Sequence, residues 1–173
     1  MATAVHRLTL EVRRSINPPE PEYQTGDWII DPDIPDAPKR HWVVIGDDIQ
    51  LKSAVERDIA DAQYLESYKQ AKIDALEEEF NSAVDSRYPG YRPLFLTAEL
   101  QEARDAGLSN RAAYIQQVLP WIKTGMKNRL FVAQDEVRAA ATIEDVDSVT
   151  QDLSTWLGSD PMVSIRTSGG IMD

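Results

Sequence analysis

The hydrophobic pattern of the chain changes from strand-like to helix-like near residue 53. Over residues 4–13, Leu8, Leu10 and Val12 alternate with polar residues, which predicts a strand with one buried face. Over residues 42–51, short apolar runs flank Gly46-Asp47-Asp48, which predicts a tight β-hairpin. The N-terminal strand needs a partner edge, and we expect it to pair with this hairpin or with another protein.

A long amphipathic helix is predicted over residues 53–87. Ser53 and Glu56 have the spacing of a capping box, in which each side chain accepts a backbone N–H at the helix start. Apolar residues then recur four and three apart, as in helices that supercoil together, although Glu66 and Lys69 interrupt the series. The predicted oligomer interface consists of Val55, Ile59, Ala62, Ile73, Leu76, Phe80 and Ala83. The alternative is a single amphipathic helix that lies on its own domain.

Prolines and glycines divide the rest of the chain. Residues 17–38 are rich in proline, so we expect an extended linker that is interrupted by Trp28-Ile29-Ile30. The segment Tyr88-Pro89-Gly90-Tyr91-Arg92-Pro93 predicts a turn that ends the long helix. Residues 159–173 are expected to form a tail that contains a short strand at residues 162–165.

Shorter helices are predicted between residues 94 and 158. Thr97 and Ser109 are the expected caps of the first two, Gly107 ends the first, and Pro120 kinks the chain or starts a new helix. Thr142 is expected to cap a last helix that reaches Gly158. The residues expected to face inward are Met126, Leu130, Ala133, Val137, Val146, Val149, Leu153 and Trp156.

Together these patterns predict a mainly α fold with four parts. They are a β module with its linker (residues 1–52), the long helix (53–87), a helical region (94–158) and the tail. The β module is the expected attachment point for a neighbouring protein. Its candidate residues are Leu8, Leu10, Val12, Trp28 and Trp42.

Composition narrows the possible functions. The chain has 173 residues, no cysteine and a net charge of −11. Absence of cysteine excludes disulfides, thiol nucleophiles and cysteine-based zinc sites. The acidic charge disfavours binding to nucleic acid and to anionic membranes. We also expect no membrane span and no signal peptide, because the chain lacks the apolar runs that these require.

Candidate chemical groups are sparse, and we predict no catalytic residue, cofactor or metal site. The acidic stretch Asp31-Pro32-Asp33-Ile34-Pro35-Asp36 lacks the glycine that a calcium loop needs for its turn. His6 and His41 lie far apart in the sequence, and His41 is expected at the hairpin surface. No Gly-x-Ser-x-Gly nucleophile motif is present.

The hairpin and capped helix of residues 39–61 resemble a motif of short accessory proteins of tailed bacteriophages, found at or near the tail fibre or baseplate. Histidine stands at position 41, where the family usually has tyrosine. The residues that carry the resemblance are Lys39, His41, Trp42, Gly46, Asp47, Ser53, Glu56, Asp58 and Asp61.

This resemblance implies a structural virion protein of the phage tail, assembled in the host cytoplasm. It further implies a homotrimer that links neighbouring tail proteins, and it brings no catalytic residues. The alternative is a tail fibre assembly chaperone that is not retained in the virion. A cytosolic enzyme is a third possibility, for which no acid–base pair, nucleophile or cofactor loop is visible in the sequence.

Overall fold

The computed structural model describes residues 2–87 and 93–159. The chain is mainly helical with a small N-terminal β region, as the sequence predicts. It divides into two compact units, with the boundary between Leu65 and Glu66. The expected turn at residues 88–93 falls almost wholly outside the described residues, and so does the expected strand at residues 162–165.

A three-stranded antiparallel sheet opens the first unit, with the order β2-β1-β3. It is formed by β1 (Ala2–His6), β2 (Val12–Ile16) and β3 (Trp28–Ile30). The single strand predicted over residues 4–13 is therefore wrong, because the chain reverses between β1 and β2. The N-terminal strand pairs with these two neighbours and not with the hairpin at residues 42–51.

His6 closes the turn that the sequence pattern missed. Its Nδ1 atom accepts the backbone N–H groups of Leu8 and Thr9 at 3.2 and 3.3 Å. The Leu10 N–H returns to the His6 carbonyl at 2.9 Å, and Leu10 has a φ of 53°. A side-chain acceptor at the end of a strand offers the backbone an alternative to further pairing. The apolar alternation of residues 8–12 is thus interrupted by local hydrogen bonds.

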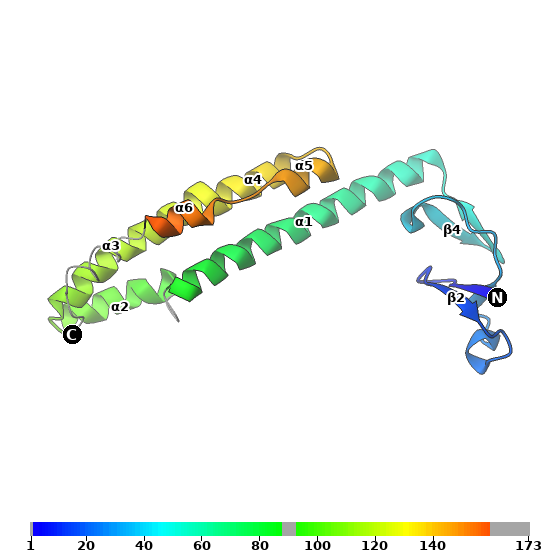
Figure 1. Ribbon diagram of the computed structural model, residues 1–173, viewed down its shortest axis with the longest axis horizontal. Helices are drawn as coiled ribbons and strands as arrows, with labels where there is room; N and C mark the ends of the chain where they lie inside the picture. The colour runs from blue at the N-terminus through cyan, green and yellow to red at the C-terminus, as the bar shows by residue number, and fades with distance from the viewer. Residues whose placement is uncertain (1, 88–92, 160–173) are drawn as a thin grey trace. The chain divides into compact units, whose positions relative to one another are not determined.

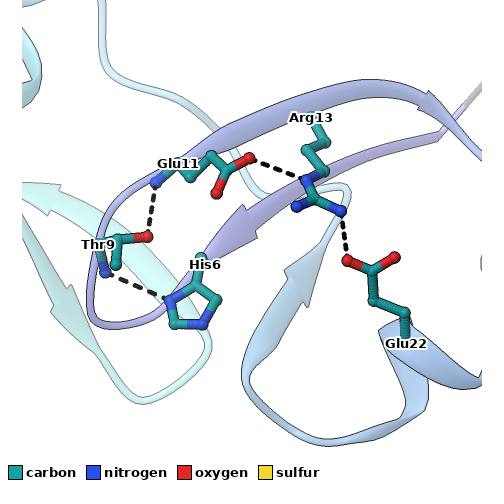
Figure 2. Close-up of polar contacts among 5 residues, drawn as sticks. All are labelled: His6, Thr9, Glu11, Arg13 and Glu22. Atoms are coloured by element: carbon teal, nitrogen blue, oxygen red, sulfur yellow. Dashed lines mark hydrogen bonds and ion pairs between the residues drawn. The ribbon is translucent and has the colours of Figure 1, made fainter.

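Polar side chains brace the same hairpin (Figure 2). Arg13 donates to Glu11 at 2.9 Å and forms an ion pair with Glu22, and its guanidinium lies 4.7 Å from the Trp28 ring centroid. The hydrogen bond from Arg13 lowers the pKa of Glu11 and raises that of Arg13. These contacts hold the segment before β3 against β2.

The proline-rich segment is folded into the first unit. It contains the 3-10 turn η1 (Pro21–Gln24) and β3, and a second 3-10 turn, η2 (Lys39–His41), follows it directly. Because β1 lies between two strands, successive residues bury opposite faces: Val5 packs with Ile29, while Ala4 packs with Trp28. The predicted interruption at Trp28-Ile29-Ile30 is the strand β3, whose apolar residues complete this core, so the segment is not extended linker throughout.

The predicted hairpin forms a separate two-stranded sheet of β4 (Trp42–Ile45) and β5 (Asp48–Leu51). Gly46 takes a φ of 63°, which the two-residue turn requires, and Asp48 already belongs to β5. Arg7 links this hairpin to the first sheet, because it donates to the carbonyls of Gly26 and Gly46 and pairs with Asp47.

The second unit consists of helices and includes most of the long helix. The helix α1 (Ala54–Arg87) has nearly the predicted bounds. The following helical elements are α2 (Pro93–Asp105), α3 (Ser109–Gly125), the π-helix η3 (Met126–Phe131), α4 (Val132–Ala139), α5 (Ile143–Ser148) and α6 (Leu153–Gly158).

Several predicted helix boundaries are corrected. Thr97 lies inside α2, and Leu108, not Ser109, is the N-cap residue of α3. Gly107 does end α2, with a φ of 72° and the paired backbone hydrogen bonds of a Schellman motif. The helix α3 continues through Pro120 to Gly125, so this proline neither ends it nor starts a new one.

The predicted last helix is two helices. Thr142 and Asp145 form the expected capping box at the start of α5. Val149 then takes an extended conformation, and Asp152 caps α6 by accepting the Thr155 N–H at 3.1 Å. The inward residues are confirmed except for Met126, which is half-buried.

An aromatic stack lies at the centre of the second unit. The Trp156 ring of α6 is stacked between Phe80 and Trp121, at centroid distances of 4.9 and 4.3 Å. Figure 1 shows α6 running alongside α1 and α3, which carry these two partners. Trp156 also fills the space beside Gly125, where a Cβ atom would overlap its ring and lie 2.6 Å from Nε1. The absence of a side chain at Gly125 therefore lets α6 dock.

We expect Gly125→Ala to destabilise the protein by about 1–3 kcal/mol, the usual range for overpacking a core. Gly158→Ala is the matched control, because a Cβ there meets nothing within 4 Å. Urea denaturation followed by circular dichroism measures both. Equal stability of the two variants would show that Trp156 moves away without cost.

Candidate functional site

The junction between the β4–β5 hairpin and α1 is held by a polar cluster. Asp61 accepts hydrogen bonds through one carboxylate oxygen from Arg40 at 2.5 Å and from His41 at 2.7 Å. Lys52 donates its Nζ to the Arg40 carbonyl and its backbone N–H to the His41 carbonyl, both at 2.8 Å. We call these four residues the junction clamp. They bring together η2, the end of β5 and the second turn of α1.

Charge and aromatic contacts reinforce the clamp. The hydrogen bond from Arg40, followed by that from His41, lowers the pKa of Asp61. The Arg40 guanidinium also lies 4.5 Å from the Tyr64 ring centroid, one turn further along the helix. The side chain of His41 is 14% exposed, so the expectation that it is a surface residue is wrong.

The start of α1 is capped as predicted. The Glu56 N–H donates to Ser53 Oγ at 3.3 Å, and the Ser53 N–H donates to Glu56 Oε2 at 2.9 Å. The hydrogen bond from the Ser53 side chain lowers the pKa of Glu56. A box of this kind contributes about 1 kcal/mol and sets where the helix begins. The capping box thus sets where the helix begins, directly after β5 and Lys52.

The residues that carry the phage resemblance occupy this junction. Besides the clamp and the cap, Trp42 is buried with Val5 and Ile29, and its Nε1 donates to the Ala37 carbonyl at 2.9 Å. Asp47 in the turn pairs with Arg7. Lys39 and Asp58 are exposed, and so are the turn and cap residues Gly46, Asp47, Ser53 and Glu56. Most of the motif residues therefore have a structural role: they hold the start of α1 against the hairpin.

An uncovered apolar stripe lies on the other side of the helix start. Val55 and Ile59 are 68% and 51% exposed, and Ala62 is also exposed. At 100° per residue these three side chains fall within about 60° of one another, and Tyr64 lies on the opposite side. We call Val55, Ile59 and Ala62 the outer stripe. The clamp therefore turns the apolar side of this helix segment away from the hairpin.

The remaining residues of the predicted oligomer interface are covered within the chain. Ile73, Leu76 and Phe80 are buried in the second unit, and Gln151 donates to the Leu76 carbonyl at 2.7 Å. Ala83 is half-buried, and the neighbouring Val84 takes the buried position instead. For these residues an intermolecular seam is corrected to an intramolecular core, because the chain's own helices supply the apolar surface.

The predicted attachment residues separate into core and surface. Trp28 and Trp42 are buried in the first unit, where Leu10 and Val12 are partly buried. Leu8 is 87% exposed at the tip of the β1–β2 turn. Among these five predicted residues, only Leu8 is mostly exposed and accessible to an attachment partner.

Both histidines and one aspartate of the acidic stretch are engaged in structural contacts. His6 accepts the turn amides, and His41 shares Asp61 with Arg40, whose hydrogen bond would compete with catalytic use of that carboxylate. In the acidic stretch, Asp31 accepts the Thr3 N–H at 2.6 Å. Within residues 2–87 and 93–159, no three histidine or acidic side chains lie close enough to hold a metal ion.

Two further results concern the chain as a whole. None of the described helices combines the length and the apolar character needed to cross a bilayer. Comparisons with protein-family models, with curated proteins and with solved structures found no match to this chain.

Sequence reasoning missed the long-range members of the site. Arg40 and Asp61 are separated by 21 positions and Arg7 and Asp47 by 40, and these ion pairs have no local spacing rule. Gly125 was also missed, since a glycine inside an apolar helix gives no sign of which side chain will fill its space. The polar run Lys39-Arg40-His41 before a strand was the available signal for the clamp.

We expect Asp61→Asn to lower the urea midpoint at pH 7, because it removes the charge that Arg40 and His41 bind. The pKa of Asp61 is lowered in the folded state from its ordinary value of 3.8, so its contribution is present above that pH. It is lost as the pH falls through the folded-state pKa. The gap in midpoint between wild type and variant should therefore narrow below about pH 4.

The control is Glu78→Gln, which removes a charge from an exposed position on the same helix. Its midpoint should stay close to that of wild type at pH 7. A gap between wild type and Asp61→Asn that is constant from pH 7 to pH 2 would contradict an electrostatic clamp.

Proposed function

We propose that this chain is a non-catalytic assembly protein of a bacteriophage tail, in the fibre or baseplate region. It self-associates through the start of α1, as a homotrimer, and links neighbouring tail proteins. The observation that carries the proposal is the outer stripe: large apolar side chains exposed on a helix that the clamp holds in a fixed orientation.

Physical chemistry supports an interface at this place. Burial of apolar area contributes about 25 cal/mol per Å², and the stripe is on a rigid, capped helix, so little ordering accompanies association. Leu8, at the tip of the β1–β2 turn, is the most exposed large apolar side chain among the described residues and the proposed contact to a tail neighbour. The phage setting itself comes from the motif at residues 39–61.

The same features suit a tail fibre assembly chaperone, which would bind a client and leave before the particle is complete. Gel analysis of purified virions of the encoding phage separates the two functions. A structural subunit should be present at a fixed multiple of other tail proteins. Consistent absence from infectious particles would favour the chaperone.

We expect Ile59→Asp to reduce the mass of the purified chain to that of one copy, about 19.4 kDa, without loss of helicity. The residue is half-exposed, so a charge there opposes association more than folding. Light scattering coupled to size exclusion measures the mass, and Asn81→Asp, on an exposed part of α1, adds the same charge as a control. A wild-type chain that remains a single copy at high concentration would overturn the proposed self-association.

A further inference from the structure

We infer that the outer stripe of one copy docks on a basic, apolar helix face of a second copy, formed by Lys123, Lys127, Phe131 and Val132. We call these four residues the basic face. The inference rests on the proposed self-association and names the surface that the stripe meets. It makes the contact head-to-tail, with two different surfaces on each copy, in place of three identical stripes meeting side by side.

Charge argues against a contact between identical stripes. The exposed ionisable residues beside the stripe include Glu56, Asp58 and Glu66, which are all acidic. Arg57, the basic residue of this turn, is partly buried and lies on the side of Tyr64, away from the stripe. Stripes packed in parallel would bring acidic side chains together, and like charges at the edges of a helix seam oppose pairing.

The basic face has the complementary character. Phe131 and Val132 are 47% and 48% exposed at the junction of η3 and α4. Lys123 and Lys127 precede Phe131 at intervals of four residues, and both are exposed. In a chain whose net charge is −11, these lysines offer opposite charges to the acidic residues that flank the stripe.

The edges of the basic face limit how the stripe can lie on it. Beyond Val132 the helix becomes acidic at Asp135 and Glu136, and Asp135 is paired with Arg138 at 2.6 Å. The lysines therefore lie on one side of the apolar pair only. Val55 and Ile59 would cover Phe131 and Val132 while Asp58 approaches Lys127, which combines apolar burial with opposite charges.

Each copy has one outer stripe and one basic face, so each copy can contact two others at the same time. A head-to-tail contact closes into a ring when the rotation between copies permits it, and a homotrimer is one such ring. A single contact is expected to hold two copies together at high concentration, and closure of the ring adds avidity.

A mixing experiment tests this inference on the full chain. Ile59→Asp disables the stripe and leaves the basic face intact, whereas Phe131→Asp does the reverse. Each variant alone should have the mass of one copy. An equimolar mixture should recover a twofold mass, since one intact joint can form, and the recovery should weaken in high salt.

Charge exchange provides the second test, with less risk to folding. Asp58→Lys and Lys127→Glu should each lower the oligomer mass, and the chain that carries both should recover it. Circular dichroism checks that the variants fold.

The outcomes separate the two proposals. A monomeric wild type overturns the self-association and this inference with it. An oligomeric wild type that is disrupted by Ile59→Asp but not by Phe131→Asp or Lys127→Glu overturns this inference alone. Failure of the mixture to form dimers also overturns it, because that result is expected of a symmetric stripe contact.

Discussion

The carboxylate of Asp61 is the contact on which the orientation of the N-terminal part of α1 depends. By accepting from Arg40 and His41 together, it attaches one side of the helix to the segment that leads into the hairpin. The capping box sets the first residue of the helix, and the clamp sets its rotation. Since side chains three and four apart share a side, fixing one side determines which residues remain outside. The exposure of Val55 and Ile59 is therefore a consequence of the clamp.

The apolar residues of α1 are covered in the second unit and exposed in the first. In the second unit its apolar residues are covered by the chain's own short helices, with Trp156 stacked on Phe80 as the central contact. In the first unit the hairpin attaches through polar groups and leaves the apolar residues uncovered. The proposed self-association would cover these residues. This difference between the units supports an assembly function more than any single residue does.

The core of the β module depends on residues that look like a linker. Proline locks φ and removes N–H donors, so a proline-rich segment reads as extended, but it can still supply a short strand between its prolines. The short strand β3 does this: Trp28 packs with Ala4 on one face of the sheet, and Ile29 packs with Val5 on the other. The β1–β2 turn was missed because it relies on His6 as a side-chain acceptor, and apolar alternation carries no information about such acceptors.

The sequence was sufficient to predict the elements that depend on neighbouring residues alone. The hairpin turn at Gly46, the caps at Ser53 and Thr142, and the length of α1 follow from backbone geometry and short-range hydrogen bonds, which a sequence displays directly. Whether an apolar stripe faces its own chain or a second one depends on distant segments, so periodicity could not separate Leu76, which is buried, from Ile59, which is exposed. Only the tertiary structure decided this, because burial is a property of what packs against a helix and not of the helix itself.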